Sequence, residues 1–249
     1  MLEIVQRFYN RKRFGIQPGL NRTIRMLNLL GNPHENLICI HVAGTNGKGS
    51  VCAMLEAMLL AYGKNTGLYT SPHLVKFNER MRMNGDDISD EELEAIAVEV
   101  EKCAEIVERE SGEPPTFFEV TTVLAFIWFA QKKADFVVVE TGMGGRLDAT
   151  NVIFPEVSVI TSISMEHITY LGDSIAKIAY EKAGIIKEKT PVVCGDIPQE
   201  AFAVIANVAS TKNAMVRSYK EITFCNANVQ DGLIKANAES QSFSYGPLV

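Results

Sequence analysis

The stretch HVAGTNGKGS, residues 41–50, is the part of the sequence on which the fold prediction depends. It continues the apolar run LICIHVA, residues 37–43, which is rich in strand-forming residues and reads as a buried parallel strand. It leads into residues 50–62, which favour a helix that ends at Gly63. A glycine-rich loop between a strand and a helix presents backbone N–H groups and the positive helix end to an anion. The sequence therefore predicts a phosphate-binding loop in an α/β fold.

Each residue of this loop is a candidate ligand of a nucleotide. The predicted nucleotide-binding residues are Gly44, Thr45, Asn46, Gly47, Lys48, Gly49 and Ser50. The glycines allow the backbone to approach closely, Lys48 can reach the terminal phosphates, and the Ser50 hydroxyl can bind Mg²⁺. The strict phosphate-loop pattern has Ser or Thr directly after the lysine, whereas Gly49 intervenes here. A glycine-rich turn without a ligand is the alternative, but it leaves the lysine and the serine unexplained.

Strands alternate with helices outward from this loop. Further strands are predicted at residues 66–70, 135–141, 156–162 and 191–194, and further helices at 89–111, 118–132 and 174–187. Two helices broken between Gly15 and Gly19 are predicted within residues 1–31, and a long loop over residues 71–88. The alternation predicts an α/β fold with a mainly parallel sheet flanked by helices. The short alternating runs between residues 218 and 245 predict a small antiparallel sheet.

The composition is that of an ordinary globular protein, with 249 residues, 47% hydrophobic and 22% charged. No run reaches the roughly 18 uncharged apolar residues that a membrane span needs, and the N-terminal residues show no secretory signal. The formal net charge of −6 disfavours a non-specific nucleic-acid binder. The five cysteines are widely spaced and predict neither a zinc site nor a disulfide framework. We expect a cytoplasmic protein without a membrane or nucleic-acid partner.

Two polar residues follow predicted strands and are candidates for a metal site. Glu140 ends the strand DFVVVET and His167 follows the strand EVSVITS, so both belong at the sheet edge that carries the phosphate loop. A carboxylate there suits Mg²⁺, and Glu166 can orient the His167 ring. The glycine-rich residues 142–148 can wrap a nucleotide or a substrate. A capping or salt-bridging Glu140 and a purely structural His167 are the alternatives.

One lysine falls within an apolar helix stripe. The stripe on the predicted helix 174–187 consists of Ile175, Ile178, Ala179, Lys182 and Ile186. Lys177 and Glu181 lie off it and are expected to pair with each other. A lysine in such a stripe must snorkel, pair or lose its charge, and a neutral amine can react with carbon dioxide to form a carbamate. Snorkelling of Lys182 at the helix edge is the alternative.

Five segments together resemble the folylpolyglutamate synthase and dihydrofolate synthase family, within the Mur ligase superfamily. The segments are HVAGTNGKGS (41–50), YTSPHL (69–74), ETGMGGRLDATN (140–151), EHITYLG (166–172) and EKAGIIK (181–187). They occur in order, and the resemblance covers nearly the whole chain. It implies an ATP-dependent acid–amino-acid ligase. In this family ATP phosphorylates a carboxylate of a folate or dihydropteroate, and the amine of glutamate then displaces the phosphate.

The resemblance also assigns roles to individual residues. It implies that Lys48 contacts the terminal phosphates and that Lys182 is carbamylated, so that Lys48, Lys182 and His167 are the catalytic residues. It implies two Mg²⁺ ions. One is held by Ser50 and Glu140, and the other by Ser71, Glu140 and His167. Pro72 and His73 belong to the loop that closes over the substrate. The family often has Asp-His where this sequence has Glu166-His167, which puts the role of that acid in doubt but not that of the histidine.

The resemblance leads to an expectation about domain organisation. Residues 1–249 are expected to form the ATP-binding domain of a Mur-type ligase, without the glutamate-binding domain that family members carry, so that this chain alone is not active as a ligase. Family members are usually monomers. Two other functions remain open, namely a nucleotide-binding module without ligase activity and a small-molecule kinase. The set of Glu140, His167 and Lys182 fits carboxylate chemistry better than a kinase.

Overall fold

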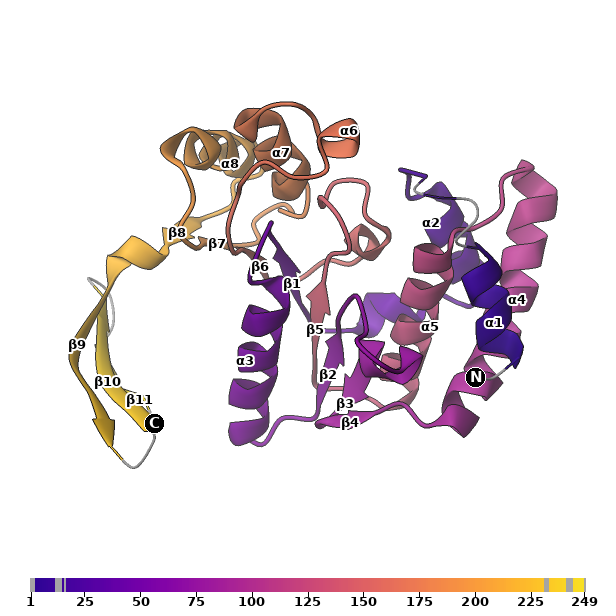
Figure 1. Cartoon of the computed structure of the whole chain (residues 1–249), viewed down its shortest axis with the longest axis horizontal. Coiled ribbons are helices and arrows are strands. Elements are labelled where there is room, and N and C mark those ends of the chain that lie inside the picture. Colours follow the sequence, from indigo (N-terminus) through magenta and orange to yellow (C-terminus); the bar gives the residue numbers. More distant parts are fainter. Residues whose placement is uncertain (1–2, 12–14, 16, 231–232, 241–243, 249) are drawn as a thin grey trace.

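The computed structural model describes residues 3–11, 15, 17–230, 233–240 and 244–248, and its largest feature is an eight-stranded sheet (Figure 1). The strands of this sheet are β1 (Cys39–Ala43), β2 (Thr66–Tyr69), β3 (Met81–Met83), β4 (Asp86–Asp87), β5 (Phe136–Glu140), β6 (Val157–Ile160), β7 (Val192–Cys194) and β8 (Val216–Ser218). They follow the spatial order β4-β3-β2-β5-β1-β6-β7-β8. The pairs from β2 to β8 are all parallel, whereas β3 and β4 join the edge in antiparallel pairing. The predicted α/β fold with a mainly parallel sheet is confirmed.

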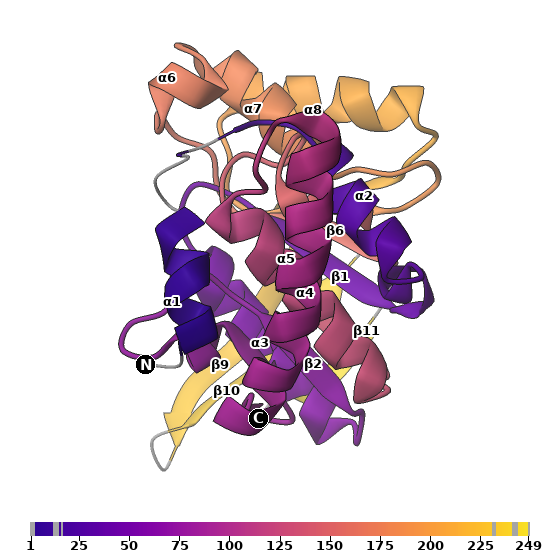
Figure 2. The ribbon, with the colours of Figure 1, turned by 90° about the vertical axis from the view of Figure 1, so that its right-hand side faces the viewer.

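Helices cover the sheet and its ends. They are α1 (Glu3–Asn10), α2 (Asn21–Leu29), α3 (Lys48–Ala61), α4 (Asp90–Ser111), α5 (Phe117–Gln131), α6 (Ile168–Leu171), α7 (Ile175–Ala183) and α8 (Gln199–Thr211), with short 3₁₀ turns at Pro33–Asn36, Phe77–Arg80, Ala149–Val152 and Tyr219–Glu221. Helix α3 lies on one face, and α1, α2, α4 and α5 form a layer on the other (Figures 1 and 2). No helix in the described part of the chain combines the length and apolar character that a membrane crossing requires.

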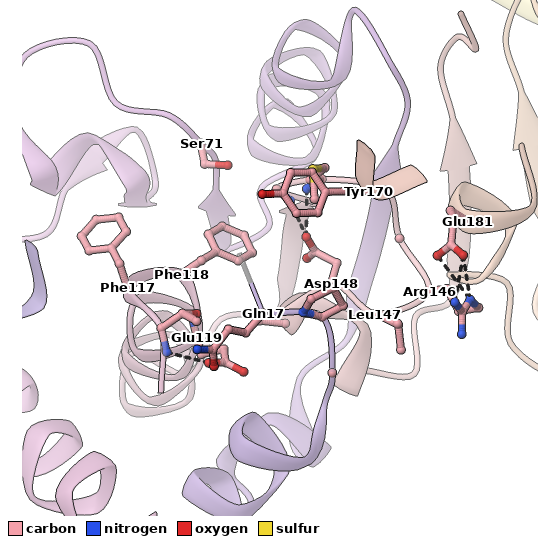
Figure 3. A pocket seen from close by; sticks show the side chains of 18 of the residues that line it. Gln17, Ser71, Phe117, Phe118, Glu119, Arg146, Leu147, Asp148, Tyr170 and Glu181 are labelled. Carbon is pink, nitrogen blue, oxygen red and sulfur yellow. Dashed lines mark hydrogen bonds and ion pairs between the residues drawn. The ribbon is translucent and has the colours of Figure 1, made fainter. Parts of the chain in front are cut away.

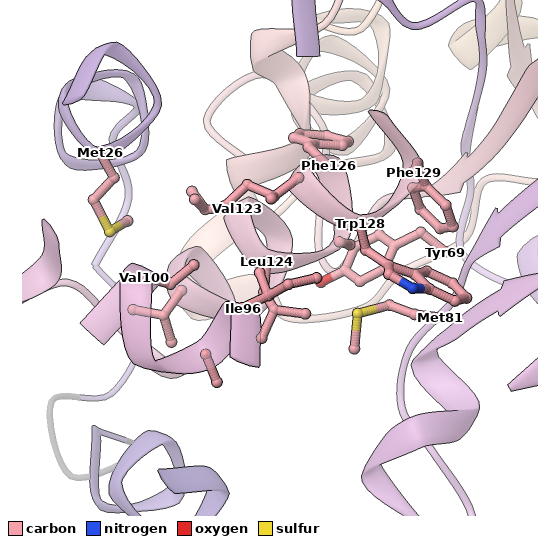
Figure 4. Packing of buried hydrophobic residues seen from close by; sticks show 14 of the residues in the cluster. Met26, Tyr69, Met81, Ile96, Val100, Val123, Leu124, Phe126, Trp128 and Phe129 are labelled. Carbon is pink, nitrogen blue, oxygen red and sulfur yellow. The ribbon is translucent and has the colours of Figure 1, made fainter. Parts of the chain in front are cut away.

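Strand β5 shows how the sequence separates the two sides of the sheet. Val137 and Val139 are fully buried in the cluster formed with α1, α2, α4 and α5, part of which Figure 4 shows. Val138, between them, is buried on the other side in a cluster with Cys52 of α3. Successive side chains of a strand point to opposite faces, so a continuous apolar run is what a doubly covered strand requires.

A second sheet contains β9 (Ile222–Gln230), β10 (Leu233–Ser240) and β11 (Ser244–Leu248) in the order β11-β10-β9. Both of its pairings are antiparallel. It extends beyond the β8 edge of the central sheet (Figure 1). The small antiparallel sheet predicted between residues 218 and 245 is therefore confirmed.

The prediction of a loop over residues 71–88 was wrong for its second half. A 3₁₀ turn over Phe77–Arg80 is followed by β3 and β4. Asn84 and Gly85 connect these strands with φ of 55° and 87°, which is the positive-φ pair that a tight hairpin turn needs. The dipeptide Asn84-Gly85 is typical of loops and also of a hairpin between short strands.

Three further differences concern the region after residue 170. Helix α8 and strand β8 were not predicted. Helix α7 ends at Ala183 rather than at Lys187, because the backbone there tightens into bonds from Ile185 N–H to the Lys182 carbonyl and from Ile186 N–H to the Ala183 carbonyl. Ser174, the first residue of the predicted helix, caps the start of α7 by accepting a hydrogen bond from Lys177 N–H.

Candidate functional site

The loop between β1 and α3 is fixed to the carboxyl end of β6. Thr45 N–H donates to the Ser162 carbonyl over 2.8 Å, and Asn46 N–H donates to Ser162 Oγ over 2.9 Å. The Thr161 hydroxyl donates to the Asn46 carbonyl over 2.7 Å. These bonds set the loop conformation before any ligand binds, which lowers the ordering cost of binding.

Lys48 and the start of α3 face this loop. Lys48 Nζ donates to the carbonyls of Gly44 and Thr45 over 3.0 and 3.3 Å. Gly47 precedes the helix with φ of 82° and gives it no side-chain cap. The ammonium group therefore lies over the loop beside helix N–H groups, an arrangement that suits the terminal phosphates of a nucleotide.

Gly44 has the least space of the loop residues, and this yields a stability prediction. Its φ is +155°, and a Cβ atom there would lie 1.9 Å from Thr161 Oγ1. We expect Gly44→Ala to lower the free energy of unfolding by about 2 kcal/mol or more, because it combines a clash with backbone strain. Urea unfolding measures this effect. Gly49→Ala is the matched control, since a Cβ atom there meets nothing closer than 3.8 Å, and a similar loss in both variants would contradict the prediction.

Glu140 lies at the end of β5, beneath the start of α3. Its side chain is buried, and Oε2 accepts a hydrogen bond from Ser71 N–H over 3.0 Å. A Cβ atom at Gly49 would lie 3.8 and 3.9 Å from the two carboxylate oxygens. Burial raises the pKa of Glu140, against the opposing effects of the Ser71 bond and of Lys48. The structure thus brings Glu140 and Ser71 to the start of α3, where Ser50 lies, and in the described residues Glu140 forms no salt bridge.

Lys182 is buried, as its place in the apolar stripe predicts. The side chain is 1% exposed, and Nζ contacts Glu166 Oε1 at 2.5 Å. Burial lowers the pKa of Lys182, while Glu166 opposes that effect. The expected Lys177–Glu181 pair was wrong, because Lys177 pairs with Asp173 and Glu181 reaches across to the neighbouring loop.

Glu166 differs from its expected role of orienting the His167 ring. His167 is exposed and precedes α6 in the left-handed conformation, with φ of 42°. The Glu166 carboxylate bonds Lys182, and the described residues show no bond from it to the His167 ring. They also contain no group of three or more His, Cys, Asp or Glu side chains suited to a metal ion. The role of His167 as a metal ligand stays a prediction.

A cavity of about 560 Å³ opens beside Ser71 and was not predicted as a pocket (Figure 3). Its walls come from residues 15, 17–19, 71–72, 116–119, 142–149 and 170–171, with Arg80 and Glu181. Pro72 of the predicted substrate loop lines it, whereas His73 lies behind and bonds Arg80 and Tyr9. The glycine-rich segment 142–148 forms one wall, and that it wraps a ligand stays a prediction. No local pattern brings the other segments together, because they are distant in the sequence.

The acidic side chains of the cavity are held by donors from the protein itself. Asp148 is buried and accepts four hydrogen bonds, from the N–H groups of Gly142, Met143 and Thr150 and from the Thr150 hydroxyl. Burial raises the pKa of Asp148, and these bonds oppose that rise. The Thr150 hydroxyl also contacts Nε2 of the buried His41 over 2.8 Å, which ties the glycine-rich segment to the central strand β1. The loop that forms this wall is therefore rigidly placed.

Known proteins resemble the chain along nearly its whole length. Residues 42–246 match the Mur ligase middle domain family. A dihydrofolate synthase/folylpolyglutamate synthase from Bacillus subtilis is 44% identical over 211 residues, which cover 84% of this chain and 49% of that protein. The folylpolyglutamate synthase structure from Thermotoga maritima has a TM-score of 0.88 at 37% identity, covering 99% of this chain and 56% of that one. An FPGS-AMPPCP-folate complex has a TM-score of 0.87 at 33% identity, covering 98% and 60%. The chain spans about half the length of the curated relatives it matches.

Proposed function

The chain belongs to the Mur ligase family, among the folylpolyglutamate and dihydrofolate synthases, and on this premise we propose that it provides the ATP site and the pterin site of an ATP-dependent amide ligase. One observation carries the proposal. The cavity adjoins Ser71, whose N–H bonds the Glu140 carboxylate beneath the phosphate loop. A carboxylate group of a molecule in the cavity can therefore approach the terminal phosphate of a nucleotide on the loop. The similarity to an FPGS-AMPPCP-folate complex supports the same pair of ligands.

The proposed reaction has two steps. A carboxylate oxygen of the pterin substrate attacks the γ-phosphorus of ATP, the bond to the β-phosphate oxygen breaks, and ADP leaves an acyl phosphate behind. The glutamate amine then attacks the carbonyl carbon, phosphate departs, and the nitrogen loses a proton. Both steps bring anions together, so Lys48 and the N–H groups of the loop stabilise the charge on the transferred phosphoryl group.

The cavity suits a flat heterocycle joined to an aromatic ring. Its volume of about 560 Å³ is within the usual range of small-molecule sites. Phe117 and Phe118 provide aromatic surface, and Gly142 leaves room because a Cβ atom there would lie 2.6 Å from the Phe118 ring. Stacking on such rings favours planar ligands.

Magnesium fits the oxygen donors that gather at Glu140. A buried carboxylate with serine hydroxyls nearby is a hard-ligand set of the kind that Mg²⁺ prefers. We propose Ser50, Ser71 and Glu140 as ligands, with His167 as the further ligand of a second ion. When bound, the metal neutralises phosphate charge and orients the transferred group.

We propose that Lys182 carries a carbamate. Its neutral amine attacks the carbon of carbon dioxide, an N–C bond forms, and a proton is released. Burial favours the neutral amine that this step requires, because it lowers the pKa of Lys182. With isotopically labelled bicarbonate, we expect a carbamate signal in the NMR spectrum of the protein. The signal should be absent in Lys182→Met and kept in Lys177→Met, an exposed lysine of the same helix. An unchanged signal in Lys182→Met would refute the carbamate at this residue.

The direct test of the proposed function is product analysis. The protein is incubated with Mg-ATP, glutamate and either dihydropteroate or tetrahydrofolate, and ADP, acyl phosphate and amide product are measured. Formation of ADP that depends on the pterin carboxylate supports the proposal, and hydroxylamine traps the acyl phosphate as a hydroxamate. Nucleotide binding without pterin-dependent ADP formation indicates a binding module. A stable phosphate ester on a hydroxyl group indicates a kinase.

A further inference from the structure

The charged groups that line the cavity are unequally neutralised. Arg146 pairs with Glu181 at 2.8 Å, and Glu119 accepts two bonds from Arg22 at 3.1 Å. Asp148 is saturated by four donors of its own segment, as described above. Each of these charged groups is thus ion-paired or hydrogen-bonded within the protein. The remaining charged residue of the lining is Arg80.

Arg80 is buried and forms no ion pair with a described residue. Its Nε donates to His73 Nδ1 over 2.7 Å, and its guanidinium lies 5.2 Å from the centre of the Phe117 ring. The charge of Arg80 acts on the Glu140 carboxyl, whose pKa it lowers, but no hydrogen bond joins the two Nη groups of Arg80 to an acceptor among the described residues. A buried cation whose donors lack a carboxylate is costly unless a ligand supplies one.

We propose that Arg80 is the residue that binds the carboxylate of the pterin substrate. This inference rests on the proposed function and adds to it a specific recognition of charge. The planar fork of a guanidinium matches a carboxylate with two parallel hydrogen bonds, and a low-polarity cavity strengthens them. The aromatic rings of the cavity bind the substrate body, and Arg80 selects the acid.

Two residues position Arg80. His73 Nδ1 accepts the Arg80 bond, so this nitrogen carries no proton, and His73 Nε2–H then donates to Tyr9 Oη over 2.9 Å. Tyr9 also stacks on Phe117, with ring centres 5.2 Å apart. The bond from Arg80 sets this tautomer, and Tyr9 of α1 holds the His73 ring in place, which links the N-terminal helix to the substrate loop.

The test compares two ligands of nearly the same shape that differ at the acid group, pteroic acid and its uncharged carboxamide. Binding to the full chain is measured by calorimetry with Mg-AMPPCP present. We expect the wild type to prefer the acid by about tenfold or more, the range typical of a charge-assisted pair. Arg80→Gln should remove this preference while the affinity for the amide stays unchanged. Arg80→Lys should restore part of it, and Tyr9→Phe should reduce it by a smaller factor.

Controls and outcomes keep the inference separate from the proposed function. Arg25→Gln, at an exposed arginine paired with Glu110, should behave as the wild type. Equal binding of acid and amide by the wild type overturns the role of Arg80 and leaves the pterin site standing, whereas binding of neither overturns both. A retained preference for the acid in Arg80→Gln also overturns the role of Arg80. The same holds if that variant loses Mg-AMPPCP binding but keeps the preference for the acid. If Arg80→Gln does not fold by circular dichroism, Tyr9→Phe decides, and an unchanged preference in that variant refutes the inference.

Discussion

Lys48→Ala is expected to weaken Mg-ATP binding by about tenfold or more and to slow acyl phosphate formation by about 100-fold or more. Lys48 Nζ is held over the loop by the carbonyls of Gly44 and Thr45, so its charge already lies where we propose that the terminal phosphates bind. Alanine removes that charge and leaves the loop bonds to β6 intact. Lys48 is proposed to stabilise the charge that develops on the phosphoryl group in the transition state more than the charge of bound ATP. The rate should therefore fall more than the affinity.

Calorimetry with Mg-AMPPCP and hydroxamate trapping of the acyl phosphate measure the two effects of Lys48→Ala. Lys64→Ala is the matched control, because Lys64 is an exposed lysine that follows the other end of α3. It should change neither quantity. Unaltered nucleotide affinity in Lys48→Ala would exclude this loop as the phosphate site.

The central sheet could be predicted because its strands are continuous apolar runs that end in glycine or polar residues. The run around Val137–Val139 gives this signal without ambiguity, since both of its faces are buried. Ser89 and Ser174 likewise mark helix starts through bonds to N–H groups three residues later. Strand β3 gave a weaker signal, since it has three residues and its partner β4 has two. Short edge strands form because they pair with a neighbouring strand, and a local sequence pattern carries no information about that pairing.

The same distinction applies to the site. The loop after β1, the place of Glu140 at the end of β5 and the burial of Lys182 could be predicted, because each depends on position within a single strand or helix. Their binding roles stay predictions. The partners of Lys182 and Glu181 could not, since Glu166 and Arg146 reach them from other segments. Charge pairing on a helix surface costs little to rearrange, so a bidentate contact between Arg146 and Glu181 outweighs the pair expected at four-residue spacing.

The lining of the cavity could not be predicted from local sequence patterns. Arg80 and Phe117 meet across 37 positions of sequence, and Tyr9 joins them from the first helix. Each of these residues alone looks like part of a core or a solvated face. Their common role arises from the packing of α1 and α5 against the substrate loop, which is a property of the tertiary fold. Resemblance to a family identifies the motif residues of such a site, but it does not identify the residues, such as Tyr9, that position them.

Glu140→Gln is expected to stabilise the fold and to impair the reaction. Burial raises the pKa of Glu140, so at neutral pH the ionised carboxyl costs folding free energy that an uncharged amide does not. The Gln carbonyl can still accept the bond from Ser71 N–H. In the absence of metal and nucleotide, we expect a melting temperature about 2–4 °C higher than that of the wild type, which corresponds to about 1 kcal/mol in a chain of this size.

The pH dependence and the metal dependence of Glu140→Gln make the prediction specific. Below the ordinary pKa of glutamate the carboxyl is protonated in both the folded and the unfolded chain, so the cost is absent. The cost grows as the pH rises toward the folded pKa and is then constant. The gain in melting temperature should therefore be present at pH 7.5, about three units above the ordinary glutamate pKa of about 4.3, and nearly vanish at pH 4, which lies below that value. The loss of a negatively charged ligand should weaken Mg²⁺ binding by about tenfold or more and slow acyl phosphate formation by about 100-fold. If Glu140→Gln loses stability and keeps full activity, Glu140 serves the fold alone. If the variant is more stable and less active, Glu140 is a carboxylate that lowers stability and is kept for metal binding.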